Sequence, residues 1–379
     1  MKFLLAATTI LLAFAGISRV RAAPIPYRRA TYMLGDRDRD STSMDSGSSD
    51  FSSDNSTDSD SSSSSTLSTG NSTDSSSNST SAGNSTDSSS NSTSSSDSTS
   101  SGGLGLPSDG LKTKNGVPFG FLPDVSAQAT MAEINKAVGM SPASTYGWYA
   151  QITGDSWDGS QLLSQKQDII DSKAVFIPAV MPTVDMSAIT SDVAKQVASV
   201  LKQFTDEGVE VWLRFAHEVN YYISSGTYHG NVDSYQTAWA NIAEAVKDNP
   251  KIKMFWCPNW ADASSLEQWF PKDASTVDIV GMDAYPQSQQ SFDDVYGSFY
   301  DAFAKKNNIP FAIGETGPGK GDDSLKEYWL KQIAEVDVQD KYPLYIAGCW
   351  FEYYKGFDFR IIMDQSSSIV AESKGEFQS

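Results

Sequence analysis

The stretch SDVAKQVASVLKQFTDEGVEVWLRFAHEVN, residues 191–220, contains two different hydrophobic patterns in succession. Apolar residues first recur every three or four positions, at Val193, Val197, Leu201 and Phe204. This spacing predicts an amphipathic helix that ends near Gly208. Residues 209–220 then form an apolar run that predicts a buried strand. The strand ends in charged and polar side chains, which are costly to bury unless they have partners or a function.

The same alternation of helix and strand continues through residues 113–379. Eight apolar runs of strand length occur, at 117–123, 144–151, 174–182, 209–220, 252–260, 277–286, 309–317 and 344–353. Helical stretches lie between them, at 127–139, 161–173, 191–207, 233–248, 291–307 and 323–340, and three are expected to be capped, by Ser191, Asp233 and Asp323. Strands buried on both faces that alternate with helices predict an α/β fold, a (β/α)8 TIM barrel. An open doubly wound sheet would favour a glycine-rich loop after the first strand, and that loop is absent from the sequence.

The N-terminus has the features of a secretory signal peptide. Lys2 precedes the apolar segment FLLAATTILLAFAGI at 3–17, and VRA at 20–22 is a suitable cleavage site. The apolar segment is shorter than the ~20 residues that a membrane span needs. We therefore expect a signal peptide at 1–22, a secreted protein and no membrane contact after cleavage. Arg28 and Arg29 form a possible second processing site.

Residues 23–112 are expected to form a disordered, glycosylated stalk. From residue 31 to residue 110 the chain is dominated by Ser, Thr, Asp, Asn and Gly, so it has few apolar groups to offset the entropy of ordering. Five glycosylation sequons occur here, at Asn55, Asn71, Asn78, Asn84 and Asn91. Such a stalk is typical of proteins associated with a cell wall.

The acidic composition excludes one class of partner. The formal net charge is −19, and twelve Asp against two Arg within 31–110 contribute −10 of it (2 − 12). A strongly acidic protein repels phosphate backbones, so we expect no nucleic-acid partner. Two cysteines, Cys257 and Cys349, lie in apolar runs; they are either buried thiols or one disulfide.

Active-site residues of such barrels gather at the carboxyl-terminal ends of the strands. In this chain those ends carry carboxylates, amides and aromatic side chains, namely Asp124, Trp148, Gln151, His217, Glu218, Asn220, Asn259, Trp260, Asp283, Tyr285, Glu315, Trp350 and Glu352. The pattern indicates a polar site at the mouth of the barrel. No spacing of His, Asp and Glu matches a metal site, and we expect neither a metal nor a cofactor.

Alternation along the fourth strand predicts which of its side chains face the barrel interior. Val211, Leu213 and Phe215 would face the helices, whereas Arg214 and Glu218 would point inward. The seventh strand would point Glu315 inward, and Tyr285 from the sixth strand lies within reach of it. Two glutamates at one barrel mouth are what retaining glycoside hydrolysis requires, with ~5–5.5 Å between them.

These residues resemble a known group of enzymes. A glutamate at the end of strand four and another at the end of strand seven are similar to clan A of the retaining glycoside hydrolases. The pattern Arg-x-x-His-Glu-x-Asn at 214–220 resembles glycoside hydrolase family 26, the family of many β-mannanases. VDIVGMDAYP at 277–286, which ends in Asp-x-Tyr, and Trp350 on strand eight also match. The resemblance covers roughly residues 113–360.

The resemblance implies a role for each of five residues. Glu218 would be the acid/base and Glu315 the nucleophile. Arg214 and Tyr285 would keep the nucleophile ionised, and His217 would orient the acid/base or contact the sugar.

Six further residues are expected to bind the substrate. Tryptophan faces suit sugar rings, and amide or carboxylate groups suit sugar hydroxyls. The expected substrate contacts are Trp148, Trp260 and Trp350 for the rings and Asn220, Asn259 and Asp283 for the hydroxyls.

The predicted function is a monomeric, secreted retaining hydrolase of β-linked polysaccharide. β-Mannan is the first candidate, with β-glucan and β-xylan next, because HEVNYYISSGTYHG lacks the Gly-x-Trp-rich continuation common in mannanases of this family. Two alternatives remain open at this point. The glutamates and Arg214 form a structural ion-pair network, or the barrel binds carbohydrate in a cell wall without hydrolysing it.

Overall fold

A computed structural model describes residues 103–124, 129–320 and 322–378 of the chain. The predicted signal peptide, the five sequons and the Arg28-Arg29 site lie outside the described residues, as does the predicted stalk up to residue 102.

Eight parallel strands close into a barrel in the order in which they occur along the chain. They are β2 (Phe119–Pro123), β3 (Thr145–Ile152), β4 (Val175–Pro182), β5 (Val211–Phe215), β6 (Ile252–Trp256), β7 (Ile279–Gly281), β8 (Phe311–Thr316) and β9 (Tyr345–Glu352). The barrel is closed where β9 pairs with β2, from Gly348 opposite Phe119 to Glu352 opposite Pro123. The predicted (β/α)8 barrel is confirmed.

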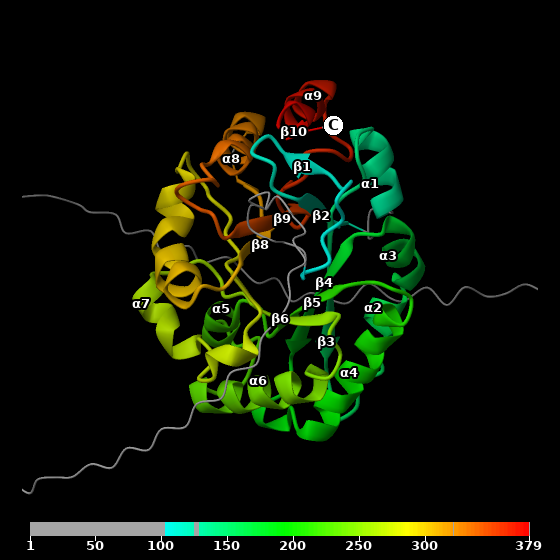
Figure 1. Cartoon of the computed structure of the whole chain (residues 1–379), viewed down its shortest axis with the longest axis vertical. Coiled ribbons are helices and arrows are strands. Elements are labelled where there is room, and N and C mark those ends of the chain that lie inside the picture. The colour runs from blue at the N-terminus through cyan, green and yellow to red at the C-terminus, as the bar shows by residue number, and fades with distance from the viewer. Residues whose placement is uncertain (1–102, 125–128, 321, 379) are drawn as a thin grey trace, which may run out of the picture. The chain divides into compact units, whose positions relative to one another are not determined.

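Helices surround the strands on the outside of the barrel (Figure 1). They are α1 (Met131–Val138), α2 (Ser160–Leu163), α3 (Lys166–Ser172), α4 (Ser191–Thr205), α5 (Val219–Ser224), α6 (Val232–Val246), α7 (Ala263–Leu266), α8 (Asp323–Glu335) and α9 (Ser367–Gly375). Between β7 and β8 the helical segment contains wide π-type turns at Asp293–Gly297 and Tyr300–Lys305. None of the helices described is both long enough and apolar enough to cross a membrane.

The N-caps of three helices lie one or two residues earlier than predicted, at Thr190 for α4, Asn231 for α6 and Asp322 for α8. In each case the cap side chain accepts a backbone N–H from the first turn, which satisfies a donor that has no partner within the helix. The predicted caps Ser191, Asp233 and Asp323 instead occupy the first or second position of their helices.

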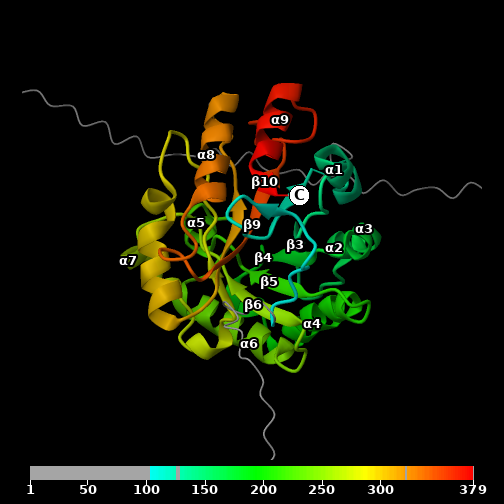
Figure 2. The same cartoon turned by 45° about the horizontal axis from the view of Figure 1, so that its top comes forward.

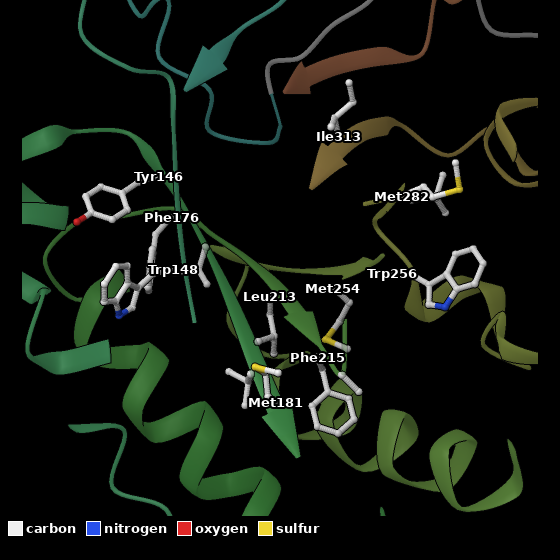
Figure 3. Packing of buried hydrophobic residues seen from close by; sticks show 14 of the residues in the cluster. Tyr146, Trp148, Phe176, Met181, Leu213, Phe215, Met254, Trp256, Met282 and Ile313 are labelled. Atoms are coloured by element: carbon white, nitrogen blue, oxygen red, sulfur yellow. The ribbon is translucent and has the colours of Figure 1, made fainter. Parts of the chain in front are cut away.

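Two layers of apolar side chains hold the barrel together. Val211, Leu213 and Phe215 of β5 face the helices. Figure 3 shows Leu213 and Phe215 near Met181 and Met254. The barrel interior contains a second cluster that includes Trp212 of β5. The predicted alternation along this strand is therefore confirmed for the residues of β5 itself.

The segment before the first barrel strand packs against the barrel. The indole N–H of Trp212, inside the barrel, donates to the carbonyl of Leu104 at 3.0 Å. Leu104 and Leu106 contact the interior cluster, and Leu111 is fully buried. Residues 103–112 therefore belong to the folded unit, and the boundary predicted after residue 112 is too late. The prediction was wrong here because a few scattered leucines form neither the periodic pattern of a helix nor that of a strand.

A small two-stranded sheet joins the two ends of the described chain. β1 (Lys112–Thr113) pairs antiparallel with β10 (Phe377–Gln378), close to α8 and α9 (Figure 2). On the same side Lys114 forms ion pairs with Glu335 and Glu376, at 3.3 and 2.9 Å. The sequence analysis did not predict this sheet, because two-residue strands carry no periodic signal.

Candidate active site

A buried arginine forms the centre of the site. Arg214 on β5 is fully buried, and one of its terminal nitrogens donates to both oxygens of Asp283, at 3.0 and 2.8 Å. The other terminal nitrogen donates to Oε1 of Glu315 on β8. A single guanidinium thus bridges carboxylates from two neighbouring segments of the barrel, a geometry that the planar fork of arginine suits.

Glu315 is held at the mouth of the barrel by a second donor. The hydroxyl of Tyr285 donates to Oε2 of Glu315 at 2.6 Å, so both carboxylate oxygens have a partner. Only 7% of the Glu315 surface is exposed. The register of β8 with β9 shifts between Ile313 and Thr316, and this irregularity surrounds Glu315. Such shifts re-aim side chains next to active sites.

Glu218 reaches the mouth by a route other than the predicted strand alternation. β5 ends at Phe215, and both Ala216 and Glu218 adopt left-handed backbone conformations, with φ of 50° and 52°. The backbone N–H of Glu218 donates to the carbonyl of Cys257 at 2.8 Å, which ties this turn to the end of β6. Left-handed conformations cost roughly 1–2 kcal/mol per non-glycine residue, and such strain gathers at functional sites.

Two asparagines position Glu218. The side-chain amide of Asn259 donates to Oε1 of Glu218 at 2.7 Å. Asn220 holds Asn259 in place through two bonds, because its amide donates to the Asn259 carbonyl at 3.0 Å and its oxygen accepts the Asn259 N–H at 2.9 Å. Both asparagines were predicted to bind sugar hydroxyls. In the structure the Asn259 side chain bonds Glu218, and the Asn220 side chain bonds the backbone of Asn259.

His217 lies beside Glu315. Its Nε2 is 3.9 Å from Oε1 of Glu315, and its ring meets Tyr222 edge to face with centroids 5.5 Å apart. Burial, together with the charge of Arg214, lowers the pKa of His217 to about 3. The imidazole is therefore neutral at neutral pH and adds no charge to the site.

The pKa values of the two glutamates move in opposite directions. Burial, reinforced by the charge of Glu315, raises the pKa of Glu218 to about 7, although the hydrogen bond from Asn259 opposes this shift. Burial acts on Glu315 as well, but the charge of Arg214 and the Tyr285 hydrogen bond outweigh it and lower the pKa of Glu315 to about 2. At pH 5 one carboxyl is protonated and the other is ionised. A protonated and an ionised carboxyl in one site are the pair of groups from which a proton donor and a nucleophile can be drawn.

One group of side chains has the right spacing for a metal ion, but a neighbouring arginine already pairs with its carboxylates. His217, Asp283 and Glu315 each offer an atom that could bind a metal, and these atoms lie within 4.8 Å of one another. Arg214 already pairs with both carboxylates, and its positive charge repels a second cation. The residues of this group therefore do not fit a metal site.

Three of the predicted substrate contacts occupy other positions. Trp148 packs in the layer between strands and helices (Figure 3), and its N–H donates to the carbonyl of Gln161. Asp283 is fully buried against Arg214, and Trp350 is fully buried, with its N–H bonded to Phe359. None of these three offers a free ring face or a free carboxylate to a sugar. The prediction failed because a position at a strand end does not reveal how deeply the side chain is buried.

The remaining tryptophan is exposed, and aromatic residues missed by the sequence analysis lie at the same end of the barrel. Trp260 follows β6 and is 37% exposed. The hydroxyls of Tyr149 on β3 and Tyr353 after β9 are hydrogen-bonded to each other at 3.1 Å, and β2 lies between these two strands. Tyr149 is the immediate neighbour of the predicted Trp148, so a shift of one residue along the strand would have found it.

Both cysteines are free and buried. Cys257 lies beside the Arg214–Asp283 pair, where its thiol donates to Asp283 at 3.0 Å. The alternative of a disulfide between Cys257 and Cys349 is excluded.

A parallel (β/α)8 barrel with two oppositely perturbed glutamates at its carboxyl-terminal mouth has the architecture of a glycoside hydrolase. The sequence profile described as glycosyl hydrolase family 26 matches residues 157–371, more than half of the chain. The chain therefore belongs to glycosyl hydrolase family 26.

Comparison with individual proteins agrees with this assignment. Endoglucanase H of Acetivibrio thermocellus is 28% identical over 176 residues, which cover 41% of this chain and 19% of that protein. The chain thus matches only about a fifth of that relative's length.

Solved structures share the fold at low sequence identity. The family 26 β-mannanase of Bacteroides ovatus is 16% identical with a TM-score of 0.51, covering 69% of this chain and 87% of that one. A modular endo-β-1,4-mannanase of Cellulomonas fimi is 13% identical with a TM-score of 0.52, covering 70% and 71%. At these identities the likeness shows the barrel architecture alone.

Proposed function

We propose that this chain is a retaining hydrolase of β-linked polysaccharide that works by double displacement. Glu315, ionised by Arg214 and Tyr285, attacks the anomeric carbon while Glu218 protonates the leaving oxygen. Glu218 then removes a proton from water, which hydrolyses the glycosyl-enzyme intermediate. The observation that carries this proposal is the opposite perturbation of the two glutamates at one mouth. The chemistry needs only two carboxyls and water, so no cofactor enters it.

β-Mannan is the first candidate polymer. Several solved structures of the same fold are described as β-mannanases, which supports this choice. The sequence relative is described as an endoglucanase, which makes β-glucan the second candidate. The first test is reducing-sugar release from β-mannan, mixed-linkage β-glucan, laminarin and β-xylan.

Three variants make this test specific. Glu315→Ala and Glu218→Ala should each abolish release, because each removes one of the two reacting carboxyls. Glu267→Ala is the matched control, since Glu267 is exposed on the outer segment after α7. Release that persists in Glu315→Ala rules out the assigned nucleophile. No release by the unmodified protein from any of the four polymers favours a carbohydrate-binding wall protein instead.

The N-terminal segment supports secretion and attachment. The apolar run at 3–17 and the cleavage site at 20–22 suit export, and the sequon-rich region suits a glycosylated stalk that associates with a cell wall. The secreted protein, which we propose is a monomer, should begin at Ala23. Its mass should fall when it is treated with an N-glycosidase. A product that retains Met1, or whose mass the glycosidase leaves unchanged, contradicts this part of the proposal.

A further inference from the structure

Exposed aromatic side chains gather at one end of the barrel. Among the described residues the large hydrophobic side chains that stay exposed are Trp260, Tyr354 and Phe357, at 37%, 55% and 39%. Trp260 follows β6, and the other two follow β9. All three therefore lie in loops at the carboxyl-terminal mouth, the end of the barrel that holds Glu218 and Glu315.

A hairpin holds Tyr354 and Phe357 in fixed positions. The N–H of Phe359 donates to the carbonyl of Tyr353, and the N–H of Lys355 donates to the carbonyl of Phe357, both at 3.0 Å. The N–H of Tyr354 also donates to Asp124 at 3.1 Å, which ties the hairpin to the end of β2. Backbone bonds at several points keep the two rings in place despite their exposure.

A cation lies over each ring. The guanidinium carbon of Arg360 is 5.8 Å from the centroid of the Tyr354 ring, and Arg360 is itself held by ion pairs with Asp358 and Asp364. Lys320 Nζ is 5.6 Å from the centroid of the Phe357 ring. Each ring thus has one face against a cation and still presents substantial surface to solvent.

The hairpin adjoins the nucleophile side of the site. Phe351 and Phe359, at its two ends, pack edge to face against Tyr285 with centroids 5.7 and 5.5 Å apart. Tyr285 in turn donates to Glu315. Trp260 follows β6, directly after Asn259, which donates to Glu218. The exposed rings therefore lie in the loops after β6 and β9, beside residues that contact the two glutamates.

We propose that Tyr354 and Phe357 form a stacking platform for the glycone part of a β-linked polysaccharide, outside the sugar that reacts. Sugar rings have an apolar face that packs on aromatic rings, while their hydroxyls stay in water. The platform is continuous with the reaction site through Phe351, Phe359 and Tyr285, so one polymer chain can occupy both. This inference rests on the proposed function, because it takes the same substrate.

Binding to an inactive variant tests the platform separately from hydrolysis. In the Glu315→Gln background, the Kd would be measured by affinity electrophoresis in gels that contain β-mannan, mixed-linkage β-glucan or β-xylan. We expect at least one polymer to retard this protein. Adding Tyr354→Ala and Phe357→Ala should weaken binding to that polymer about tenfold or more, equivalent to about 1.4 kcal/mol. Tyr354→Trp should preserve binding, because it keeps an aromatic face.

A matched control lies on the outer ring of helices. Tyr328→Ala removes a partly buried tyrosine from α8 and should leave polymer binding unchanged. The protein with Tyr354→Ala and Phe357→Ala added to Glu315→Gln is called the double variant here, and Glu315→Gln alone is its parent. Unchanged binding in the double variant overturns the platform. A parent protein that none of the polymers retards overturns it as well. If the unmodified protein releases sugar while the double variant binds like its parent, the platform fails and the proposed function stands. If the double variant loses binding but the unmodified protein hydrolyses no polymer, the platform stands and the function fails.

Discussion

Arg214 determines the charge state of the site at the scale of single residues. Its two bonds to Asp283 prevent the guanidinium from turning away from Glu315. A buried carboxylate without such a partner would be protonated at neutral pH, as Glu218 is predisposed to be. One arginine, placed nearer to one glutamate than to the other, thus separates the pKa values of two chemically identical groups.

The pH dependence of catalysis should report this separation. The proposed mechanism requires Glu218 to be protonated in the first step, so kcat/KM should fall as the pH rises through about 7. In Asn259→Ala the ionised form of Glu218 loses a hydrogen bond, so its pKa should rise and the alkaline limb should move to higher pH. The measurement is kcat/KM against pH. Asn249→Ala, which removes an amide far from the site, should leave the limb in place. A limb that moves downward or stays fixed in Asn259→Ala contradicts the assignment of Glu218.

Strand β8 shows how an element is fitted to the site. At Gly314 an added Cβ would lie 2.5 Å from Oδ1 of Asp283, 2.5 Å from the sulfur of Cys257 and 2.8 Å from a nitrogen of Arg214. The absence of a side chain at this position lets the arginine–aspartate pair pack directly against the strand that carries Glu315.

Gly314→Ala should therefore damage both stability and activity. Overpacking of a filled interior costs about 1–3 kcal/mol, and here the atoms displaced belong to the ion pair. We expect a lower free energy of unfolding in urea and a fall in kcat of at least about tenfold. Gly375→Ala, at a position where nothing lies within 4 Å, should change neither quantity. Full activity in Gly314→Ala would show that the pair tolerates displacement.

Strand β9 anchors the loop that carries the exposed aromatic hairpin. The carboxylate of Glu352, fully buried, accepts the backbone N–H groups of Ile361, Ile362 and Met363 at 2.7 to 2.9 Å. An amide has one acceptor oxygen instead of two, so Glu352→Gln should leave backbone donors unsatisfied. We expect a loss of about 1–3 kcal/mol in the free energy of unfolding and a higher KM for polymer. Glu372→Gln, at an exposed position on α9, is the control. An unchanged KM would separate the loop from substrate binding.

Strands and helices could be predicted from the sequence where the periodic spacing of apolar side chains is enough to define them. The active site could be predicted only in part. Alternation along β5 placed Arg214 correctly inside the barrel. Glu218 lies beyond the strand, and its direction depends on left-handed conformations at residues 216 and 218 that carry no glycine signal. Trp350 was misplaced because burial depth depends on the loop that covers it. Tyr354 and Phe357 were missed because a loop has no periodicity from which to read orientation.

At the scale of the whole folded unit, the two ends of the described chain are held at the barrel. Residues 103–111 contact the interior cluster through Leu104 and Leu106, and Lys112 and Thr113 pair with Phe377 and Gln378. The segment therefore contributes to stability although it contains none of the eight barrel strands.

Truncation tests this contribution. Protein that begins at Asp97 should melt at the same temperature as one with the complete predicted stalk. Protein that begins at Lys112 loses Leu104, Leu106 and the fully buried Leu111. Full burial of a leucine side chain contributes about 1.5–3 kcal/mol, and the partly buried Leu104 and Leu106 add less each, so we expect the Tm to fall by at least about 5 °C in calorimetry. Equal Tm values for the two truncations would show that the segment does not belong to the folded unit.

The most direct test of the two glutamate roles is the configuration of glycosyl azides formed when azide replaces the missing carboxylate. NMR would identify the products made from an activated β-glycoside of the sugar that the polymer assay identifies. The account predicts a β-glycosyl azide from Glu218→Ala, because azide attacks the covalent intermediate on Glu315. It predicts an α-glycosyl azide from Glu315→Ala, because azide then attacks the substrate directly. The reverse pattern, or a β-azide from both variants, would contradict the assignment of Glu218 as acid/base and Glu315 as nucleophile.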